Sequence, residues 1–400
     1  MQNISPTVRN IFSIPGIRLA LFLATQLTLS LPDIHVYVKV GFCLFALASL
    51  IAENPNVKNI LPLLTFSATF AAISYVNGAI HSNFELLGML LCPLAYYLMG
   101  CSVVRTSQSE DGILWVILLT IVSSNLILWV NNIADVSQNG LVNVSRIIAT
   151  DDGSVLSATL QSMTASLGTA CVVCAISYGV RKKAVFIISI LAAALSLFCI
   201  IHLVTRTGLI VFAVVVFVAL MYNYREQWWK ILLTAVFVAV VFVLVAQLGG
   251  FYFDALDAYA ERNEDSSIAS GGLRTIIWKN ALNDFVTHPF GWSNKVSYYA
   301  HNLWLDVARC AGMLPFFILV AISVRNYQFT YRLFKMEGNP LVGFIVGLNV
   351  CMFLSAFMEP VLEGVSTYFY LMCMIWGIQR VYYEHIEDEY DEEGNDEDCE

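Results

Sequence analysis

Apolar runs long enough to cross a membrane recur along almost the whole chain. Each run holds roughly 17 to 25 residues, and a helix of that length spans the hydrocarbon layer of a bilayer. Hydrophobic residues form 58% of the 400-residue chain and charged residues only 13%, which is typical of membrane proteins. The sequence therefore predicts an all-α integral membrane protein with about twelve transmembrane helices.

The predicted spans make residues 1–383 one polytopic membrane domain, and their even number places both termini on the same side. They are residues 13–31, 34–52, 59–80, 84–104, 112–131, 155–179, 184–203, 207–223, 229–248, 303–324, 341–359 and 364–383. The tail, residues 384–400, holds 11 of the 30 acidic residues and is expected to be disordered and solvated.

The distribution of basic residues predicts that both termini are cytoplasmic. Short connections on the N-terminal side carry many lysines and arginines, for example at 181–183. The short connections opposite carry only Arg146 and Arg206, with Lys39 near the end of a span. Because basic residues in short loops stay on the cytoplasmic side, the long polar loop of residues 249–302, between spans nine and ten, is expected to face outward.

The long loop contains a predicted helix from Ser270 as N-cap to residue 285, ended by the His-Pro pair at 288–289. The helix is indicated by apolar residues that recur every four positions, namely Leu273, Ile277, Ala281 and Phe285. Arg274 and Trp278 lie one turn apart beside this stripe. Two interpretations fit: a helix resting on the membrane surface with Arg274 facing a substrate, or an interfacial helix with an ordinary snorkelling arginine.

Arg206 lies at the outer rim of the bilayer with no acidic residue nearby in the sequence. An arginine at this depth is costly, so Arg206 is a functional candidate, with an interface anchor as the alternative. His202 is expected to be a satisfied interface residue. In span ten, Asp306 and Arg309 are three residues apart and are expected to neutralise each other.

One face of the sixth predicted span is polar or small, at Ser157, Gln161, Thr164 and Gly168. Such a face in a membrane helix lines a cavity or packs tightly against another helix, and the sequence leaves both open.

Several features, in this order, resemble the O-antigen ligase and O-antigen polymerase superfamily of bacterial membrane enzymes. They are the spans with a long loop between the ninth and tenth, TRTGL at Arg206, GLRTIIW at Arg274, HPFGW, and His301-Asn302 followed after nine residues by Gly312. The resemblance covers most of the chain, and its most specific motif is the last one.

Members of that family are inner-membrane glycosyltransferases that transfer a glycan from undecaprenyl diphosphate to an acceptor sugar on the periplasmic side. The resemblance implies a lipid-linked glycan donor, a glycan or lipid A-core acceptor and no cofactor. It also implies a multi-pass location in the bacterial inner membrane and contacts with other polysaccharide-assembly membrane proteins.

The candidate residues suit this chemistry in their own right. A lipid diphosphate gains charge as it leaves, and fixed cations stabilise that charge, so Arg206 and Arg274 are candidate catalytic residues. His301 is the candidate base for the acceptor hydroxyl, with Asn302 or the loop backbone orienting it. The candidate substrate-binding residues are Arg146, Asn302, Trp278 and His288, of which His288 is also the alternative base.

The sequence leaves ligase and polymerase both open, because Gly312 is followed by Met-Leu-Pro and the outer loop is short, unlike many ligases. A multi-span transporter or flippase of lipid-linked glycans is the alternative class. The polar residues gather at one face instead of the midplane, which favours the enzyme. The first outer loop offers only Asp33 as a metal ligand, so metal-independent activity is expected, and no nucleic-acid-binding pattern is present.

Overall fold

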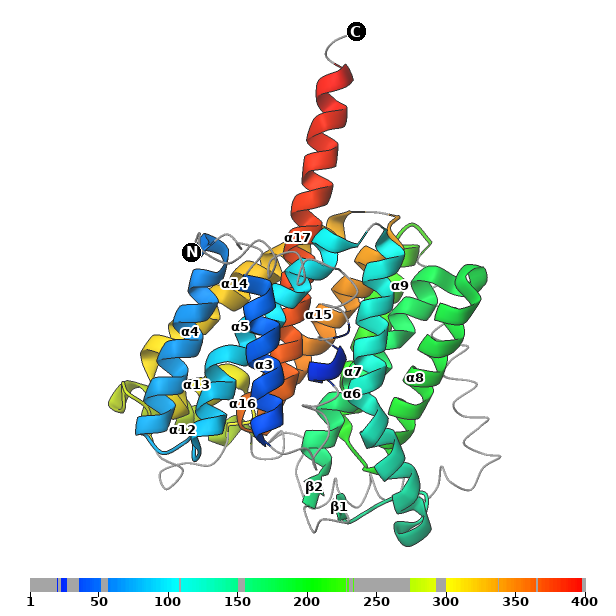
Figure 1. Cartoon of the computed structure of the whole chain (residues 1–400). Helices are drawn as coiled ribbons and strands as arrows, with labels where there is room; N and C mark the ends of the chain where they lie inside the picture. The colour runs from blue at the N-terminus through cyan, green and yellow to red at the C-terminus, as the bar shows by residue number, and fades with distance from the viewer. Residues whose placement is uncertain are drawn as a thin grey trace.

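Helices running up and down form a bundle, with a two-stranded hairpin at one end (Figure 1). The computed structural model describes residues 20, 23–26, 36–51, 57–107, 109–149, 155–227, 229, 233, 274–292, 300–336, 338–364 and 366–397. The predicted spans 13–31 and 229–248, and the loop from 249 to 273, lie almost entirely outside these residues.

The other predicted spans are helical. In chain order the long helices are α3 (Val36–Ile51), α4 (Val57–Val76), α5 (Asn83–Thr106), α6 (Glu110–Asn139), α7 (Ala158–Tyr178), α8 (Lys183–His202), α9 (Arg206–Tyr224), α14 (Met313–Lys335), α15 (Pro340–Met358) and α17 (Ser366–Glu397). Six helical stretches of the described chain are long and apolar enough to cross a membrane, and one of them, Ala158–His202, comprises α7 and α8. The protein is a multi-pass membrane protein, whereas the total of about twelve spans stays a prediction.

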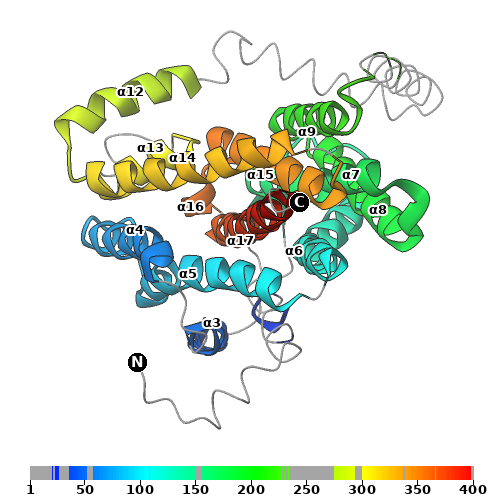
Figure 2. The same ribbon diagram turned by 90° about the horizontal axis from the view of Figure 1, so that it is seen from above.

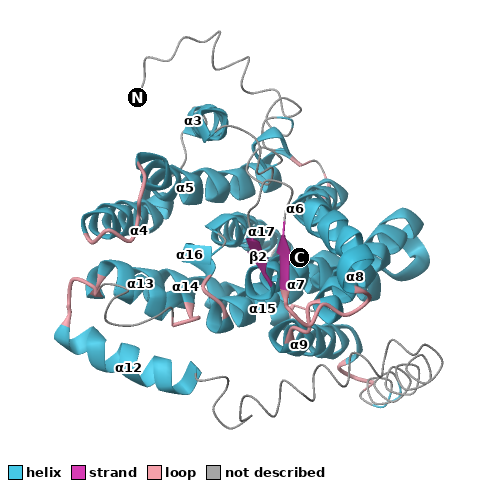
Figure 3. Ribbon diagram, turned by 90° about the horizontal axis from the view of Figure 1, so that it is seen from below, coloured by secondary structure: helices cyan, strands magenta, loops and turns pink. Residues whose placement is uncertain are grey.

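The two ends of the bundle differ. One end carries β1 (Ile147–Ala149), β2 (Val155–Ser157) and the short helix α16 (Val361–Gly364), and is called the hairpin end below (Figure 3). The C-terminal part of α17 extends from the opposite end, the tail end (Figure 1). The predicted start of the sixth span, residue 155, is wrong, since the chain there forms β2, paired antiparallel with β1.

The α5 and α17 helices pack closely in the middle of the bundle (Figure 2). A Cβ atom added at Gly100 would lie 2.0 Å from the Met374 carbonyl oxygen, and one at Gly377 would lie 2.2 Å from that of Tyr97. Only glycine allows two backbones to approach so closely. In a membrane, where lipid is as apolar as the helices, such close backbone contact is a main source of helix association.

The α6 helix continues past the predicted end at residue 131 because its last polar residues find partners on neighbouring helices. Asn132 Nδ2 donates to Gln161 Oε1 of α7 at 2.8 Å. A Cβ atom at Gly168 would lie 1.9 Å from Ser196 Oγ of α8. The polar face of α7 is therefore used in helix packing, which is one of the two alternatives that the sequence left open.

The predicted span 303–324 is wrong as a single helix. The chain forms α13 (Leu303–Ala311), breaks at Gly312 with a φ of 79°, and starts α14 directly afterwards. A Cβ atom at Gly312 would lie 2.2 Å from the Pro289 carbonyl oxygen, and Met313 N donates to the same oxygen at 2.9 Å. The HPFGW turn thus occupies the break, and hydropathy alone gives no sign of it.

A further helix, α12 (Arg274–Thr287), lies across the side of the bundle (Figure 2). Its stripe of Ile277, Ala281 and Phe285 packs against α13 and α14, and the ring centroids of Phe285 and Phe316 are 4.8 Å apart. The prediction that this stripe rests on the membrane surface is therefore wrong, because the break at Gly312 presents α13 and α14 as a protein surface for it. The proposed N-cap Ser270 lies outside the described residues.

The α17 helix extends to Glu397, whereas the sequence predicts a disordered tail from residue 384. Arg380 Nε lies 2.9 Å from Glu384 Oε1, and the Tyr383 hydroxyl donates to Glu387 Oε1 at 2.9 Å. Side-chain pairs spaced four residues apart support a helix, and these carry α17 beyond the apolar run.

Candidate functional site

Backbone strain marks three turns at the hairpin end: the turn before β1, the turn between α8 and α9, and the turn before α13. Among the described non-glycine residues, only Arg146, Val204 and His301 have a positive φ, of 59°, 51° and 51°. Each such conformation costs about 1–3 kcal/mol and persists only where the surroundings hold it, which occurs most often at functional sites. Arg146 and His301 are themselves candidate site residues, and Val204 lies two positions before the candidate Arg206.

Glu359, the C-cap of α15, links two of the predicted catalytic residues. Its Oε1 atom lies 3.2 Å from Arg274 Nη2, and its Oε2 atom lies 3.7 Å from His301 Nδ1. The Glu359 side chain is 3% exposed, whereas those of Arg274 and His301 are 25% and 30% exposed. Neither His301 Nδ1 nor Glu359 Oε2 has a hydrogen-bond partner in the described part of the chain, so the two atoms face each other.

Arg206 is the first residue of α9 and joins this group through its neighbour. Arg274 Nη1 lies 3.5 Å from Thr207 Oγ1. The start of α9 is held on α8, because the N–H and the hydroxyl of Thr205 both donate to the Ile200 carbonyl, at 3.0 and 3.1 Å. Half-buried Arg206 therefore stands at a fixed helix N-terminus, whose partial positive charge adds to its own.

Arg146 contacts the same turn from the other side. Its Nε donates to the Leu203 carbonyl at 3.3 Å, and its backbone N–H donates to Asn143 Oδ1 at 2.9 Å. These contacts place Arg146 beside the turn that leads into Arg206.

The Arg146 turn is held by a buried polar network centred on Asp135. Asp135 Oδ2 accepts from Asn143 Nδ2 at 2.7 Å and lies 2.9 Å from His202 Nε2, while Asp135 Oδ1 accepts from Asn139 Nδ2 at 2.9 Å. His202 Nδ1 lies 3.0 Å from the Leu141 carbonyl. His202 is satisfied, as predicted, but it is fully buried instead of lying at the membrane interface, because α6 extends over it.

The strained turn at His301 is held by Asp306. The Asp306 carboxylate accepts from the N–H groups of Ala300 and Asn302 at 2.7 and 3.2 Å. The predicted pairing with Arg309 is present, with Nε 3.8 Å from Asp306 Oδ1 and both side chains buried. Asp306 therefore fixes the backbone on both sides of His301 in addition to neutralising Arg309.

The side chain of Asn302 also holds the turn at His301 by hydrogen bonds. Its Oδ1 accepts from Leu305 N at 3.2 Å and caps α13, and its Nδ2 donates to the Phe357 carbonyl at 3.1 Å. The Asn302 side chain is thereby directed to α13 and α15, so in this structure the turn, and not that side chain, orients His301.

Trp278 lies beside the group formed by Arg274, Glu359 and His301, whereas His288 lies far from it. Trp278 Nε1 donates to the Ala300 carbonyl at 2.6 Å, and its ring lies edge-on to Phe357 with centroids 5.1 Å apart. Trp278 therefore docks α12 onto the His301 turn. His288 lies at the other end of α12, about 20 Å from Arg274 along the helix axis, and its Nδ1 lies 2.8 Å from the Thr287 hydroxyl. The structure does not bring His288 to the site.

Glu359 is the main residue of the site that the sequence motifs did not indicate. An acidic residue at the end of a long apolar run, followed by proline, needs a partner, and the outer arginines supply one.

In the described part of the chain, no three histidine, cysteine, aspartate or glutamate side chains are grouped as a metal site, and metal independence stays a prediction.

The described chain is thus a multi-pass helical bundle with arginines, a histidine and a carboxylate gathered at one end. Residues 191–320, about a third of the chain, match the family model described as O-antigen ligase, and this match supports the resemblance to the O-antigen ligase and polymerase superfamily. The matched region contains Arg206, Arg274 and His301 and ends before Glu359. A comparison with curated proteins gives no match.

Proposed function

We propose that this protein transfers a glycan from undecaprenyl diphosphate to an acceptor sugar at the periplasmic face of the bacterial inner membrane, as an O-antigen polymerase or ligase. The family match supports ligase or polymerase activity in general. The observation that carries the specific proposal is the contact of Arg274 and His301 with one buried carboxylate, beside the N-terminus of α9.

Arg206 and Arg274 bind the diphosphate in this mechanism, with Arg146 beside them for the glycan or a phosphate. Transfer breaks the bond between the anomeric carbon and the diphosphate oxygen, and negative charge grows on the leaving group. Fixed guanidinium groups at a partly buried site stabilise that charge without reorganising. A bidentate fork suits phosphate oxygens better than the point charge of a lysine.

His301 takes the proton of the acceptor hydroxyl as its oxygen bonds to the anomeric carbon. Because Nδ1 faces Glu359, a proton on Nδ1 points to the carboxylate and Nε2 is left as the basic atom. The imidazolium that forms is stabilised by the same carboxylate, as in other histidine–carboxylate pairs. Undecaprenyl diphosphate then leaves, and the proton remains on His301 for release.

Purified variants test this assignment. His301→Ala, Arg206→Ala and Arg274→Ala are each expected to insert normally and to lose roughly 100-fold or more of the transfer rate. Arg206→Lys is also expected to be impaired. A wild-type rate in any alanine variant removes that residue from the mechanism.

Transfer in EDTA is expected to continue, and a loss that a divalent cation restores contradicts metal independence.

The lipopolysaccharide of a deletion strain separates the two branches of the family. Core capped with a single repeat indicates a polymerase. Uncapped core, with lipid-linked polymer accumulating, indicates a ligase. A transporter or flippase instead predicts no transfer by the purified protein.

A further inference from the structure

A cavity of about 320 Å³ lies between α4, α5, α14 and α17, in the part of the bundle toward the tail end (Figure 2). Its volume is that of a small ligand pocket. We call it the tail-end cavity. The candidate site lies at the opposite, hairpin end, so the mechanism above makes no use of this cavity.

The polar and apolar residues that line the tail-end cavity are separated by depth. Asn59, Arg325 and Arg380 lie nearer the tail end. Leu63 lies one turn deeper than Asn59 on α4, and Ile318 lies two turns deeper than Arg325 on α14, about 10 Å along the helix axis. A charged rim above an apolar interior fits an amphiphile with an anionic head better than it fits a soluble anion.

Arg380 forms one wall of the rim and is fixed in place. Its Nη2 donates to Asn59 Oδ1, its Nη1 lies 3.4 Å from the Tyr97 hydroxyl, and its Nε lies 2.9 Å from Glu384 Oε1. The Arg380 side chain is only 10% exposed. A guanidinium held in this way loses little further freedom when it binds an anion.

Two more arginines give the rim an excess of positive charge. Arg325 is exposed on the α14 wall, where its guanidinium carbon lies 5.9 Å from the centroid of the Phe329 ring, and it forms no ion pair with another described residue. Arg105 lines a smaller adjoining cavity, beside Arg380. Among the described residues that line the two cavities, none is acidic. The carboxylate of Glu384 therefore balances only part of this charge.

Trp376 also lines the cavity, one turn deeper than Arg380 on α17, or about 5 Å. The residue is fully buried, yet its indole Nε1 has no hydrogen-bond partner in the described part of the chain. A buried donor of this kind needs an acceptor. A glycerophospholipid carries ester carbonyls a few ångströms below its phosphate, which is the depth of this donor.

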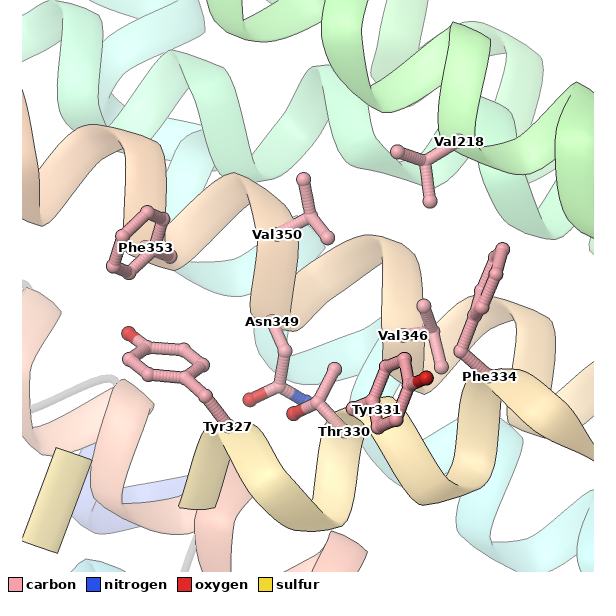
Figure 4. A pocket seen from close by; sticks show the side chains of 9 residues that line it. All are labelled: Val218, Tyr327, Thr330, Tyr331, Phe334, Val346, Asn349, Val350 and Phe353. Carbon is pink, nitrogen blue, oxygen red and sulfur yellow. The ribbon is translucent and has the colours of Figure 1, made fainter. Parts of the chain in front are cut away.

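Another cavity shows what is specific to the tail-end cavity. It measures about 380 Å³ and lies between α9, α14 and α15, with Val218, Val350 and Phe353 among its lining residues (Figure 4). None of the residues that line it is charged. This second cavity can accept hydrocarbon but offers no counter-charge to an anionic head.

We infer that the tail-end cavity binds one anionic glycerophospholipid. Its phosphate lies at Arg325 and Arg380, an ester carbonyl lies at Trp376, and the first methylenes of its chains contact Leu63 and Ile318. Basic pockets between membrane helices bind anionic lipid head groups in this way. The inference is independent of the proposed function, because it concerns binding at the other end of the bundle.

The test is native mass spectrometry of the purified full-length protein with phosphatidylglycerol or phosphatidylcholine that carry the same acyl chains. The wild type is expected to bind phosphatidylglycerol at least about fivefold more tightly. Arg325→Gln, at an exposed position that the fold does not need, is expected to lose about fivefold in affinity for phosphatidylglycerol and to keep its affinity for phosphatidylcholine. Trp376→Phe is expected to weaken both lipids alike, about threefold, because both carry the ester carbonyl.

Arg332→Gln is the matched control. Arg332 is also an exposed arginine of α14, but it lies outside the cavity, with its guanidinium carbon 5.8 Å from the centroid of the Tyr383 ring. It is expected to keep the wild-type affinity for both lipids, as is Val350→Phe in the uncharged cavity.

Three results overturn the inference. Equal affinities of the wild type for the two lipids show that the arginines select no head group. Equal losses in Arg325→Gln and Arg332→Gln show a general effect of surface charge. Displacement of phosphatidylglycerol by millimolar glycerol phosphate shows a site for a soluble anion instead of a lipid.

Discussion

The candidate site depends on the buried carboxylate of Glu359. A substitution that keeps the shape of this side chain tests the role of its charge alone. Glu359→Gln keeps the size of the side chain but leaves Arg274 and the His301 imidazolium without their counter-charge. We expect kcat to fall about 10–100-fold, as for other residues that orient a functional histidine. Single-turnover transfer measures this effect. Glu384→Gln, which removes the partner of Arg380 at the tail end, is the control and is expected to keep the wild-type rate.

Asp135 makes a prediction about stability instead of chemistry. Its carboxylate is buried, accepts from Asn139 and Asn143, and lies 2.9 Å from His202 Nε2. Asp135→Asn leaves some of these donors unsatisfied, at a cost of about 1–3 kcal/mol in the free energy of unfolding. Because the residues share one network, the loss in Asp135→Asn and His202→Asn together is expected to be smaller than the sum of the single losses. Thermal unfolding in detergent measures it, and additive losses contradict the network.

The break between α13 and α14 gives a prediction that distinguishes conformational strain from close contact. Gly312→Ala forces a left-handed φ on alanine, about 1–2 kcal/mol, and also drives its Cβ into the Pro289 carbonyl. Gly338→Ala also forces a positive φ, of 81°, on alanine, but its Cβ would meet no atom within 4 Å in the described part of the chain. We expect Gly312→Ala to lower the melting temperature clearly more and to reduce transfer. Equal shifts in the two variants contradict a structural role for the contact with the HPFGW turn.

The arrangement of the whole bundle predicts how it sits in the membrane. The tail end carries basic residues such as Lys182, paired with Asp111, and Arg225, bonded to the Phe334 carbonyl. We propose that this end faces the cytoplasm and the hairpin end the periplasm. In a Cys399→Ser background, Gly140→Cys is expected to react with a membrane-impermeant maleimide in intact spheroplasts and Gly338→Cys only after lysis; the described native cysteines are buried. The reverse pattern contradicts this orientation.

The helical membrane architecture follows from the sequence alone. In lipid, backbone groups must be satisfied within the segment, so long apolar runs form helices whatever surrounds them. The predicted spans 184–203 and 341–359 are therefore offset from α8 and α15 by one residue at each end. Motifs also predicted Arg206, Arg274 and His301 as the residues of interest, since rim arginines and a histidine are costly unless used.

Only the tertiary structure decided which partners those residues have. Glu359, the break at Gly312, the docking of the α12 stripe and the tail-end cavity all depend on contacts between segments far apart in the chain. Asn77 Nδ2, for example, donates to the Phe290 and Cys310 carbonyls at 2.7 and 2.9 Å. Hydrophobic periodicity reflects the overall polarity of the surroundings of each helix. It carries no information on whether those surroundings are lipid or another helix, because both are equally apolar.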